Sequence, residues 1–314
     1  MGAALALASR GIGLSTPNPS VGCVLVNDGR VVARGRTSAG GRPHAEAAAL
    51  TAAGPAARGA TAYVTLEPCA HHSQRGPSCA GVLIAAGIAR VVVAALDPDP
   101  RTNGEGAARL RAAGISVVTG VRAAEAEAGL AGFLTRQRHG RPHITLKLAV
   151  SLDGAIALAD GRSRWITGER MRAAAHLLRA RCDLIVVGRG TWDADKPALD
   201  VRLPGLAARS PRIGVVGRAG GLPAHVSHFA DLVALAGDSA LNILAEGGMG
   251  LAASLLGADL VDELLLHRAP ILIGGGRGLG DISLDDLADA HGRWQAAPIV
   301  TLGADRIERY TRTR

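Results

Sequence analysis

Three residues in the first third of the chain, His44, Cys69 and Cys79, are of the types that bind a transition-metal ion. Zinc prefers thiolate sulfur and imidazole nitrogen in a tetrahedral shell, and a catalytic zinc site has three protein ligands and leaves the fourth position to water. With only four cysteines in 314 residues, unevenly placed, the chain lacks the pattern of a secreted disulfide framework. The sequence therefore predicts a zinc site in a protein of the reducing cytoplasm.

Glu46 follows His44 by two residues, so both belong to the first turn of one predicted helix but point in different directions. From there its carboxylate can reach a zinc-bound water without binding the metal. Zinc lowers the pKa of such a water toward about 7, and a positioned carboxylate adds roughly 10²–10⁴ in rate by proton transfer. The pattern H-x-E, then P-C, then a second cysteine is the one that zinc nucleobase deaminases use. We therefore predict hydrolytic deamination, with Glu46 as the catalytic residue.

The same residues could also belong to a structural zinc site. A purely structural zinc site needs a fourth protein ligand, which His71 or His72 could supply. The polar, Gly-terminated stretch "AHHSQRG" favours instead a loop close to the substrate. The remaining cysteines, Cys23 and Cys182, are expected to pack as small hydrophobic residues.

The secondary structure expected around the metal site alternates between strands and helices. Residues 21–35 contain two β-prone runs around the turn "NDG", which predicts a hairpin. A helix is expected to start near Pro43 and to end at Gly54, and Cys79 should lie at the start of another. Two helix N-termini would then point at the metal and help to stabilise the thiolates.

The polar segment "RHGRPH" at residues 138–143 separates a helical run from a new strand, and we place a domain boundary there. The chain is long enough for two packed cores, so residues 1–140 should form one domain and residues 141–314 another. Strands and helices alternate in both, which indicates layered α/β sheets without an internal repeat. Strands of the second half are expected over residues 183–188, 211–217, 231–237 and 241–248.

The formal charge of +8 raises the question of a nucleic-acid partner. The basic residues are scattered, and with 2% aromatic residues a base-stacking platform is hard to build. A basic surface suited to small phosphorylated molecules explains the charge better. No apolar stretch is long enough to span a bilayer, and the apolar start lacks the basic region of a signal peptide. The sequence thus predicts a cytoplasmic protein without a nucleic-acid or membrane partner.

One turn in the second half indicates a cofactor site. The glycines at residues 273–280 lack the G-x-G-x-x-G spacing of a dinucleotide fingerprint. By contrast, "LNILAEGGMGLAAS" predicts a strand, a glycine turn and a helix, whose backbone N–H groups could bind a pyrophosphate between Gly247 and Gly250. On the residues alone, an ordinary tight turn is equally compatible. Lys147, one of only two lysines, is a candidate substrate-binding group on a predicted strand.

These motifs together resemble the bifunctional deaminase/reductases of riboflavin biosynthesis, over nearly the whole chain. The motifs that carry the resemblance are "TPNPSVG", "HAE", "LEPCAHH", "DPDP", "KLAVSLDG", "SRWIT" and "AEGG". The nine residues between Cys69 and Cys79 also match the long loop of this family, with one residue more than its common form. Nucleic-acid deaminases usually have a much shorter loop between the two cysteines.

The resemblance implies an α/β fold with an N-terminal cytidine-deaminase-like three-layer domain and a C-terminal dihydrofolate-reductase-like domain. It also implies zinc-dependent deamination of 2,5-diamino-6-ribosylamino-4(3H)-pyrimidinone 5′-phosphate, and then reduction of the ribosyl group to ribityl with NADPH. Asn18 would hydrogen-bond the pyrimidine, and Arg75 is the candidate for contacting the substrate phosphate.

By the same resemblance, two sets of residues would line the reductase pocket. Facing NADPH would be Ala149, Trp165, Thr191, Asp195, Gly248, Met249, Gly250, Leu251, Ala252, Ala253 and Ser254. Facing the substrate, beside Lys147, would be Ser163, Arg179, Leu199, Arg202 and Glu246. Lys196 stands where the family usually has Asp or Asn, and we interpret it as a solvated loop residue.

Two rival functions are compatible with part of the sequence. One is an RNA deaminase whose second half is a binding domain, which only the positive charge favours. The other is a non-enzymatic scaffold held together by zinc. Oxidation of NADPH by the protein would separate both from the main prediction. The sequence does not fix the oligomeric state, and a homo-oligomer is compatible with it.

Overall fold

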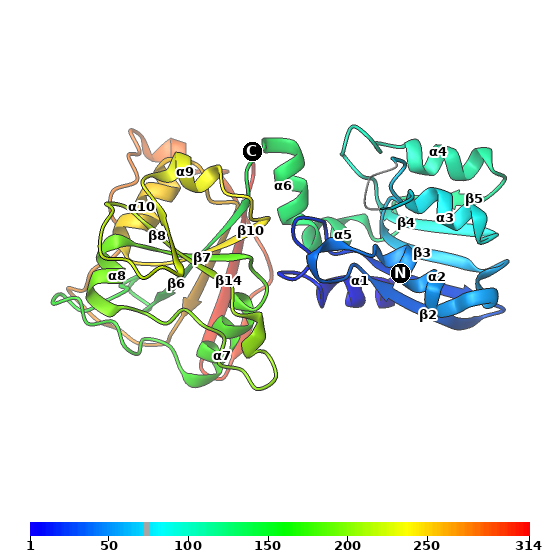
Figure 1. Cartoon of the computed structure of the whole chain (residues 1–314). Coiled ribbons are helices and arrows are strands. Elements are labelled where there is room, and N and C mark those ends of the chain that lie inside the picture. Colours follow the sequence, from blue (N-terminus) through cyan, green and yellow to red (C-terminus); the bar gives the residue numbers. More distant parts are fainter. Residues whose placement is uncertain (72–75) are drawn as a thin grey trace. The chain divides into compact units, whose positions relative to one another are not determined.

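The computed structural model describes residues 1–71 and 76–314, and the chain divides into two compact units, Met1–Arg141 and Pro142–Arg314 (Figure 1). Each unit has its own sheet and its own buried apolar core. Arg75 and His72, both singled out from the sequence, lie outside the described residues.

The sheet of the first unit has the strand order β2-β1-β3-β4-β5. β1 runs antiparallel to both of its neighbours, whereas β3, β4 and β5 are parallel. The predicted hairpin is confirmed, because Asp28 and Gly29 between β1 and β2 have φ angles of 46° and 72°, the left-handed values that a two-residue hairpin turn requires. The strands are β1 (Gly22–Asn27), β2 (Arg30–Arg36), β3 (Thr61–Leu66), β4 (Arg90–Ala95) and β5 (Ser116–Val118).

Helices cover both faces of this sheet. On one face α2 contacts α3, and α3 contacts α4. On the other face α1 contacts α5. The expected three-layer α/β architecture is confirmed. The helices are α1 (Gly2–Ser9), α2 (Ala45–Ala53), α3 (Cys79–Ala85), α4 (Glu105–Ala112), α5 (Ala123–Gly129) and α6 (Ala131–His139), with the 3₁₀ turns η1 (Ala39–Gly41) and η2 (Gly54–Ala57).

Two glycines explain how α1 and α2 approach the sheet so closely. Gly22 and Cys23 are neighbours on β1, so their Cα substituents point to opposite faces. A Cβ on Gly22 would collide with the Ala4 carbonyl of α1, and a Cβ on Gly35, the partner of Cys23, would collide with the Ala45 carbonyl of α2. The two helices therefore lie on opposite faces, and the N-terminus of α2 carries His44.

The second unit is built on a nine-stranded sheet in the order β12-β14-β11-β6-β10-β7-β8-β9, with β13 paired to β14. β6 to β11 are parallel to their neighbours in this set, and β14 runs antiparallel to β11. The strands are β6 (His143–Val150), β7 (Leu184–Gly188), β8 (Arg212–Val216), β9 (Val226–Phe229), β10 (Asn242–Glu246), β11 (Glu263–Arg268), β12 (Trp294–Ala296), β13 (Val300–Leu302) and β14 (Asp305–Arg312).

One predicted strand of this unit is wrong. Residues 231–237 form the short helix α9 (Leu232–Ala236) and not a strand. The reason is local, because the Asp231 carboxylate accepts a hydrogen bond of 2.8 Å from the Ala234 N–H and caps the helix. The other helices are α7 (Glu169–Arg179), α8 (Arg189–Asp195) and α10 (Met249–Gly257), with the 3₁₀ turns η3 (Ala207–Arg209) and η4 (Leu287–Ala290).

The parallel strands bring several functional candidates to one edge of the second sheet. Glu246 is the last residue of β10 and Gly188 the last of β7, and Lys147 lies opposite Glu246 in the β6–β10 register. In open α/β sheets, ligands bind in the crevice outside the carboxyl ends of the strands. The fold therefore places a ligand site at this edge. Across the described parts of the chain, no helix is long and apolar enough to cross a membrane.

Candidate active sites: a metal centre and a cofactor cavity

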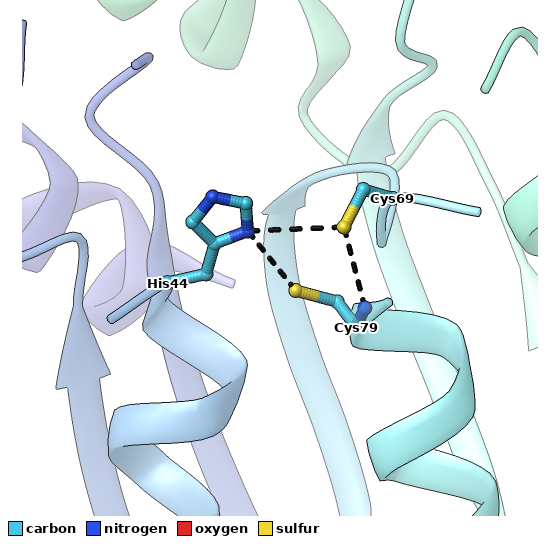
Figure 2. Close-up of side chains that lie close together, drawn as sticks. All are labelled: His44, Cys69 and Cys79. Carbon is cyan, nitrogen blue, oxygen red and sulfur yellow. Dashed lines mark hydrogen bonds between the residues drawn. The ribbon is translucent and has the colours of Figure 1, made fainter. Parts of the chain in front are cut away.

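The three predicted metal ligands converge in the first unit (Figure 2). His44 is the N-cap of α2, Cys79 is the first residue of α3, and Cys69 lies in the loop after β3. His44 Nδ1 lies 3.2 Å from Cys79 Sγ and 3.8 Å from Cys69 Sγ. The helix begins two residues later than expected from Pro43, so the imidazole extends from the cap position and not from the first turn.

The electrostatics of the cluster suit a metal ion. The Cys79 N–H donates to Cys69 Sγ over 3.3 Å, and the hydrogen bond from the Cys79 thiol lowers the pKa of Cys69. The same hydrogen bond and burial raise the pKa of Cys79, so Cys69 is the sulfur that ionises first. A thiolate is the form that binds metal. The nitrogen and the two sulfurs all lie within 4.8 Å of one another, and this donor set is the one that a catalytic zinc ion takes. The residues present therefore fit zinc.

The structure bears on the alternative of a closed, purely structural site. Within residues 1–71 and 76–314, the metal-binding cluster has three members and no fourth protein ligand. His71 lies apart from it, with Nδ1 3.5 Å from Thr102 Oγ1. His72, the other candidate for a fourth ligand, lies outside the described residues. The three ligands that the structure describes match the ligand set of a catalytic zinc site.

Glu46, the second residue of α2, lies beside the cluster without belonging to it. Its side chain is 3% exposed, and burial raises the pKa of its carboxyl to about 7. A carboxyl that titrates near neutral pH can both accept and donate a proton. Its place on the first turn, buried against the ligands, is what proton transfer at the metal centre requires.

Asn18 contacts the ring nitrogen of His44 that faces away from the sulfurs. Its Nδ2 lies 2.9 Å from His44 Nε2 and 3.0 Å from the Gly41 carbonyl oxygen. Because Nδ2 is a donor, this contact is a hydrogen bond when His44 Nε2 carries no proton and accepts. Asn18, which was predicted to hydrogen-bond the pyrimidine, therefore also contacts the metal ligand His44, which the sequence did not indicate.

A buried carboxylate that the sequence analysis missed supports the loop carrying Cys69. Glu67 is 2% exposed and accepts hydrogen bonds from the backbone N–H groups of Asp97, Gly104 and Ala107, at 3.2, 3.0 and 2.9 Å. These bonds tie the end of β3 to the segment that follows β4. The sequence could have indicated Glu67, because it directly follows an apolar strand, where a buried carboxylate without partners costs free energy.

The second unit contains a cavity of about 1500 Å³ at the carboxyl ends of its parallel strands. It contains nearly all of the residues predicted for the reductase pocket. Those that line it are Lys147, Ala149, Ser163, Trp165, Arg179, Thr191, Asp195, Leu199, Arg202, Glu246, Gly248, Met249, Gly250, Leu251 and Ser254. Lys196, interpreted as a loop residue, is exposed, ends α8 with a φ of 39° and also lines the cavity.

Ala252 and Ala253 correct the predicted run of cofactor-facing residues. The run continues into α10, and a helix cannot present consecutive side chains to one side. Ala252 is fully buried in the apolar core, and Ala253 lies toward Gly280. The side chains of these two residues do not line the cavity. The N-terminus of α10 does, and the Gly248 N–H donates to Thr191 Oγ1 over 3.1 Å.

A charged cluster lies at the floor of this cavity. Arg179 donates two hydrogen bonds of 2.8 Å to the two carboxylate oxygens of Glu246. Burial raises the pKa of Glu246, but the bonds from Arg179 and the charge of Lys147 outweigh it and lower the pKa overall. Burial also lowers the pKa of the Lys147 ammonium. The cluster offers fixed donors and acceptors to a polar ligand.

Trp165 marks the mouth of the cavity. Its side chain is 65% exposed, and the guanidinium of Arg172 lies 4.9 Å from the ring centroid. An exposed aromatic face next to a cation can stack on a flat ring of a ligand. Trp165 was predicted to face the cofactor, whereas Arg172, His176 and His267, which also line the cavity, were not predicted.

Comparison with known proteins agrees with these two sites. Residues 1–95 match the cytidine and deoxycytidylate deaminase zinc-binding region, and residues 142–305 match the RibD C-terminal domain. The chain is 42% identical to the riboflavin biosynthesis protein RibD of Escherichia coli, over 92% of each chain. It is 40% identical to RibD of Mycobacterium tuberculosis, over 94% of this chain and 91% of that one.

Solved structures give the same result. Acinetobacter baumannii RibD superposes with a TM-score of 0.89 at 34% identity, covering 100% of this chain and 98% of the other. A diaminohydroxyphosphoribosylaminopyrimidine deaminase/5-amino-6-(5-phosphoribosylamino)uracil reductase from Thermotoga maritima superposes with a TM-score of 0.87 at 30% identity, over 100% and 97% of the two chains.

The fold and the two sites define a zinc-dependent deaminase joined to an NADPH-dependent reductase. The chain belongs to the RibD family, the bifunctional deaminase/reductases of riboflavin biosynthesis. The predicted fold class, activity and cofactors are confirmed at this level.

The metal centre leads to a first prediction. Purified protein should contain one zinc per chain, and Cys69→Ala should lose it, because removal of one of three protein ligands leaves an incomplete shell. Elemental analysis measures this directly. Because the ligands bind only when deprotonated, zinc should also be released in acid. Wild-type protein that stays below one zinc per chain after supplementation would contradict the prediction, and Cys182→Ala serves as the matched control.

Proposed function

We propose that residues 1–140 deaminate 2,5-diamino-6-ribosylamino-4(3H)-pyrimidinone 5′-phosphate and that residues 141–314 reduce the ribosyl group of the product to ribityl with NADPH. The observation that carries the proposal is that one chain contains both residue sets, the His44, Cys69 and Cys79 cluster in one unit and the cavity floor of Lys147, Arg179 and Glu246 in the other.

In the deaminase site, His44, Cys69 and Cys79 would hold the metal. When bound, zinc acidifies the attacking water. Glu46 takes a proton from that water and delivers it to the leaving amine, a role that suits a carboxyl whose pKa is raised to about 7 by burial. Asn18 positions the pyrimidine, and Arg75 contacts the phosphate.

In the reductase site, the cofactor residues are those that line the cavity from Ala149 to the N-terminus of α10. NADPH supplies the hydride that reduces the ribosyl C1. Gly250 has open space beside its Cα at the helix start, so the pyrophosphate can approach the backbone there, whereas the Gly248 N–H is already bonded to Thr191 Oγ1. Lys147, Glu246 and the other predicted substrate residues, Ser163, Arg179, Leu199 and Arg202, provide the polar and apolar contacts for the sugar phosphate.

A two-step assay tests the proposal. With the diamino substrate, full-length protein should release ammonia and then oxidise one NADPH for each ammonia. With the already deaminated compound it should oxidise NADPH without releasing ammonia. Protein that releases ammonia from RNA but not from this substrate would point to the rival RNA deaminase. The expected setting is the cytoplasm, with a small phosphorylated molecule as ligand, and the protein could act as a homo-oligomer.

The domain assignment gives a second prediction. A fragment of residues 141–314 keeps the complete nine-stranded sheet and the cavity, so it should fold and bind NADPH alone. It should oxidise NADPH with the deaminated compound much faster than with the diamino compound, because a changed exocyclic group leaves buried hydrogen bonds unsatisfied. Cooperative unfolding is checked first, since domains can share an apolar interface. A cooperatively folded fragment that binds no NADPH would contradict the assignment.

A further inference from the structure

His267 is a buried polar residue in the second unit that none of the roles above uses. It lies on β11 within the apolar stretch "ELLLHRAP", its side chain is 0% exposed, and it lines the cavity. Neither Nδ1 nor Nε2 has a hydrogen-bond partner within residues 142–314, which the structure describes in full. A buried polar group without a partner costs about 1–3 kcal/mol, so an unpaired imidazole facing a ligand cavity calls for a functional explanation.

The strand register places His267 next to both proposed ligands. On the β6–β11 ladder it lies directly opposite Ala149, and on the β6–β10 ladder Lys147 lies opposite Glu246. Lys147 and Ala149 are two residues apart on β6, so they share a face of the sheet with His267 and Glu246. The imidazole thus lies between the cofactor-facing position Ala149 and the charged cluster of the cavity floor.

The charges around His267 keep its ring neutral. Burial and the ammonium of Lys147 lower the pKa of His267 to about 3, and the Glu246 carboxylate offsets them only in part. A neutral imidazole carries one hydrogen-bond donor and one acceptor. Lys147 can only donate and ionised Glu246 can only accept, whereas neutral His267 can pair with a hydroxyl in either role, donating from one ring nitrogen or accepting at the other.

We propose that His267 is a substrate-contacting residue of the reductase site, which hydrogen-bonds a hydroxyl of the ribosyl chain beside Lys147 and Glu246 and so fixes the position of C1 for reduction. The proposal rests on the proposed reductase function. In this role His267 stays neutral and transfers no proton. The pH profile of the reduction should therefore keep its shape when the residue is changed. Lys147 and Glu246 are the charged groups that act on it.

The test compares His267→Phe with His267→Gln in full-length protein. Phenylalanine removes both hydrogen-bonding atoms but keeps a flat ring, so kcat/KM for the deaminated compound should fall about 5- to 150-fold, the cost of a buried hydroxyl without its partner. Glutamine retains a donor and an acceptor and should recover most of this loss. The dissociation constant of NADPH alone should stay within about twofold, because the ring contacts the substrate.

Stability and pH readouts separate this role from a structural one. The Tm of His267→Phe should be equal to or above that of the wild type, because an unpartnered polar group has been replaced by an apolar one. Ammonia release from the diamino substrate should be unchanged. The pH profile of reduction between about 5 and 9 should keep its shape, because the pKa of His267 is about 3, well below the unperturbed histidine value near 6.5, and the ring stays neutral in this range. His225→Phe, an exposed histidine outside the cavity lining, is the matched control.

Several outcomes would overturn the inference. Unchanged kcat/KM in His267→Phe would mean that the imidazole touches no substrate, and weakened NADPH binding would make it a cofactor contact. Equal losses in the Phe and Gln variants at wild-type Tm would mean that a donor and an acceptor at this position do not restore reduction, which contradicts the hydrogen-bonding role. Wild-type protein that does not oxidise NADPH with the deaminated compound would refute the proposed function itself, which is a different result.

Discussion

Glu46→Gln should reduce ammonia release from the diamino substrate by roughly 10²–10⁴-fold, the contribution of a positioned general acid and base. Glutamine has nearly the same shape as glutamate, so it can fill the buried space on the first turn of α2, but its amide neither takes up nor releases a proton at neutral pH. The measurement is the rate of ammonia release at saturating substrate, with zinc content determined on the same sample.

Two controls decide what such a loss means. Zinc should stay at one per chain, because Glu46 lies outside the ligand cluster, and oxidation of NADPH with the deaminated compound should be unchanged, because that reaction uses the other unit. Loss of zinc from Glu46→Gln would make the residue structural. Full deaminase activity with zinc bound would exclude it as the proton carrier and leave a solvent water or a substrate group in that role.

The metal centre was predictable because its chemistry fixes residue types and not only positions. Imidazole, thiolate and a nearby carboxylate are rare enough in combination that His44, Cys69 and Cys79 could be read from the sequence, and the structure brings their ligand atoms together. The hairpin at Asp28 and Gly29 was predictable for a similar reason, since few residues accept positive φ.

Other features depend on long-range packing, which local patterns do not contain. The apolar run of α9 fits a strand as well as a helix, and the cap formed by Asp231 favours the helix. The strand order that places β14 beside β11 depends on the pairing of distant segments. Ala252 was assigned to the cofactor because a sequence motif is continuous, whereas a helix turns every residue to a new direction.

His267 shows the limit of reading single residues. A lone histidine in an apolar strand is normally expected to be a satisfied core residue, so the sequence gives no reason to choose it. The register that sets it opposite Ala149, and the absence of a partner for either ring nitrogen in the second unit, become visible only once β6, β10 and β11 are assembled.

The pair of Arg179 and Glu246 carries the prediction with the largest expected effect on stability. Arg179→Met would leave the Glu246 carboxylate, only 13% exposed, without its two hydrogen bonds. Breaking a buried ion pair from one side costs about 3–5 kcal/mol, and Lys147, which remains near the carboxylate, should keep the loss near the lower value. At about 2–4 °C per kcal/mol for a unit of this size, the reductase transition should fall by about 6 °C or more in calorimetry.

The pH dependence of this loss has a definite sign. The folded pKa of Glu246 is lowered, so its contribution to stability is present above the unfolded value of about 4.3 and is lost as the pH falls through the folded pKa. Wild-type and Arg179→Met proteins should therefore differ most at neutral pH, and the difference should shrink in acid. A constant difference from neutral pH down to about pH 3 would contradict the assignment of the stability to the ionised pair.

The double variant Arg179→Met/Glu246→Leu distinguishes stability from function. Removing both charges should restore most of the Tm, because a buried ion pair replaced by apolar side chains is often neutral or stabilising. Lys147 can respond by a further fall in its pKa, which burial already lowers. Oxidation of NADPH with the deaminated compound should stay low in the double variant although the protein is stable again, while ammonia release is unaffected. Recovery of reduction together with the Tm would mean that the pair only holds the unit together, and that the substrate is bound by other residues of the cavity.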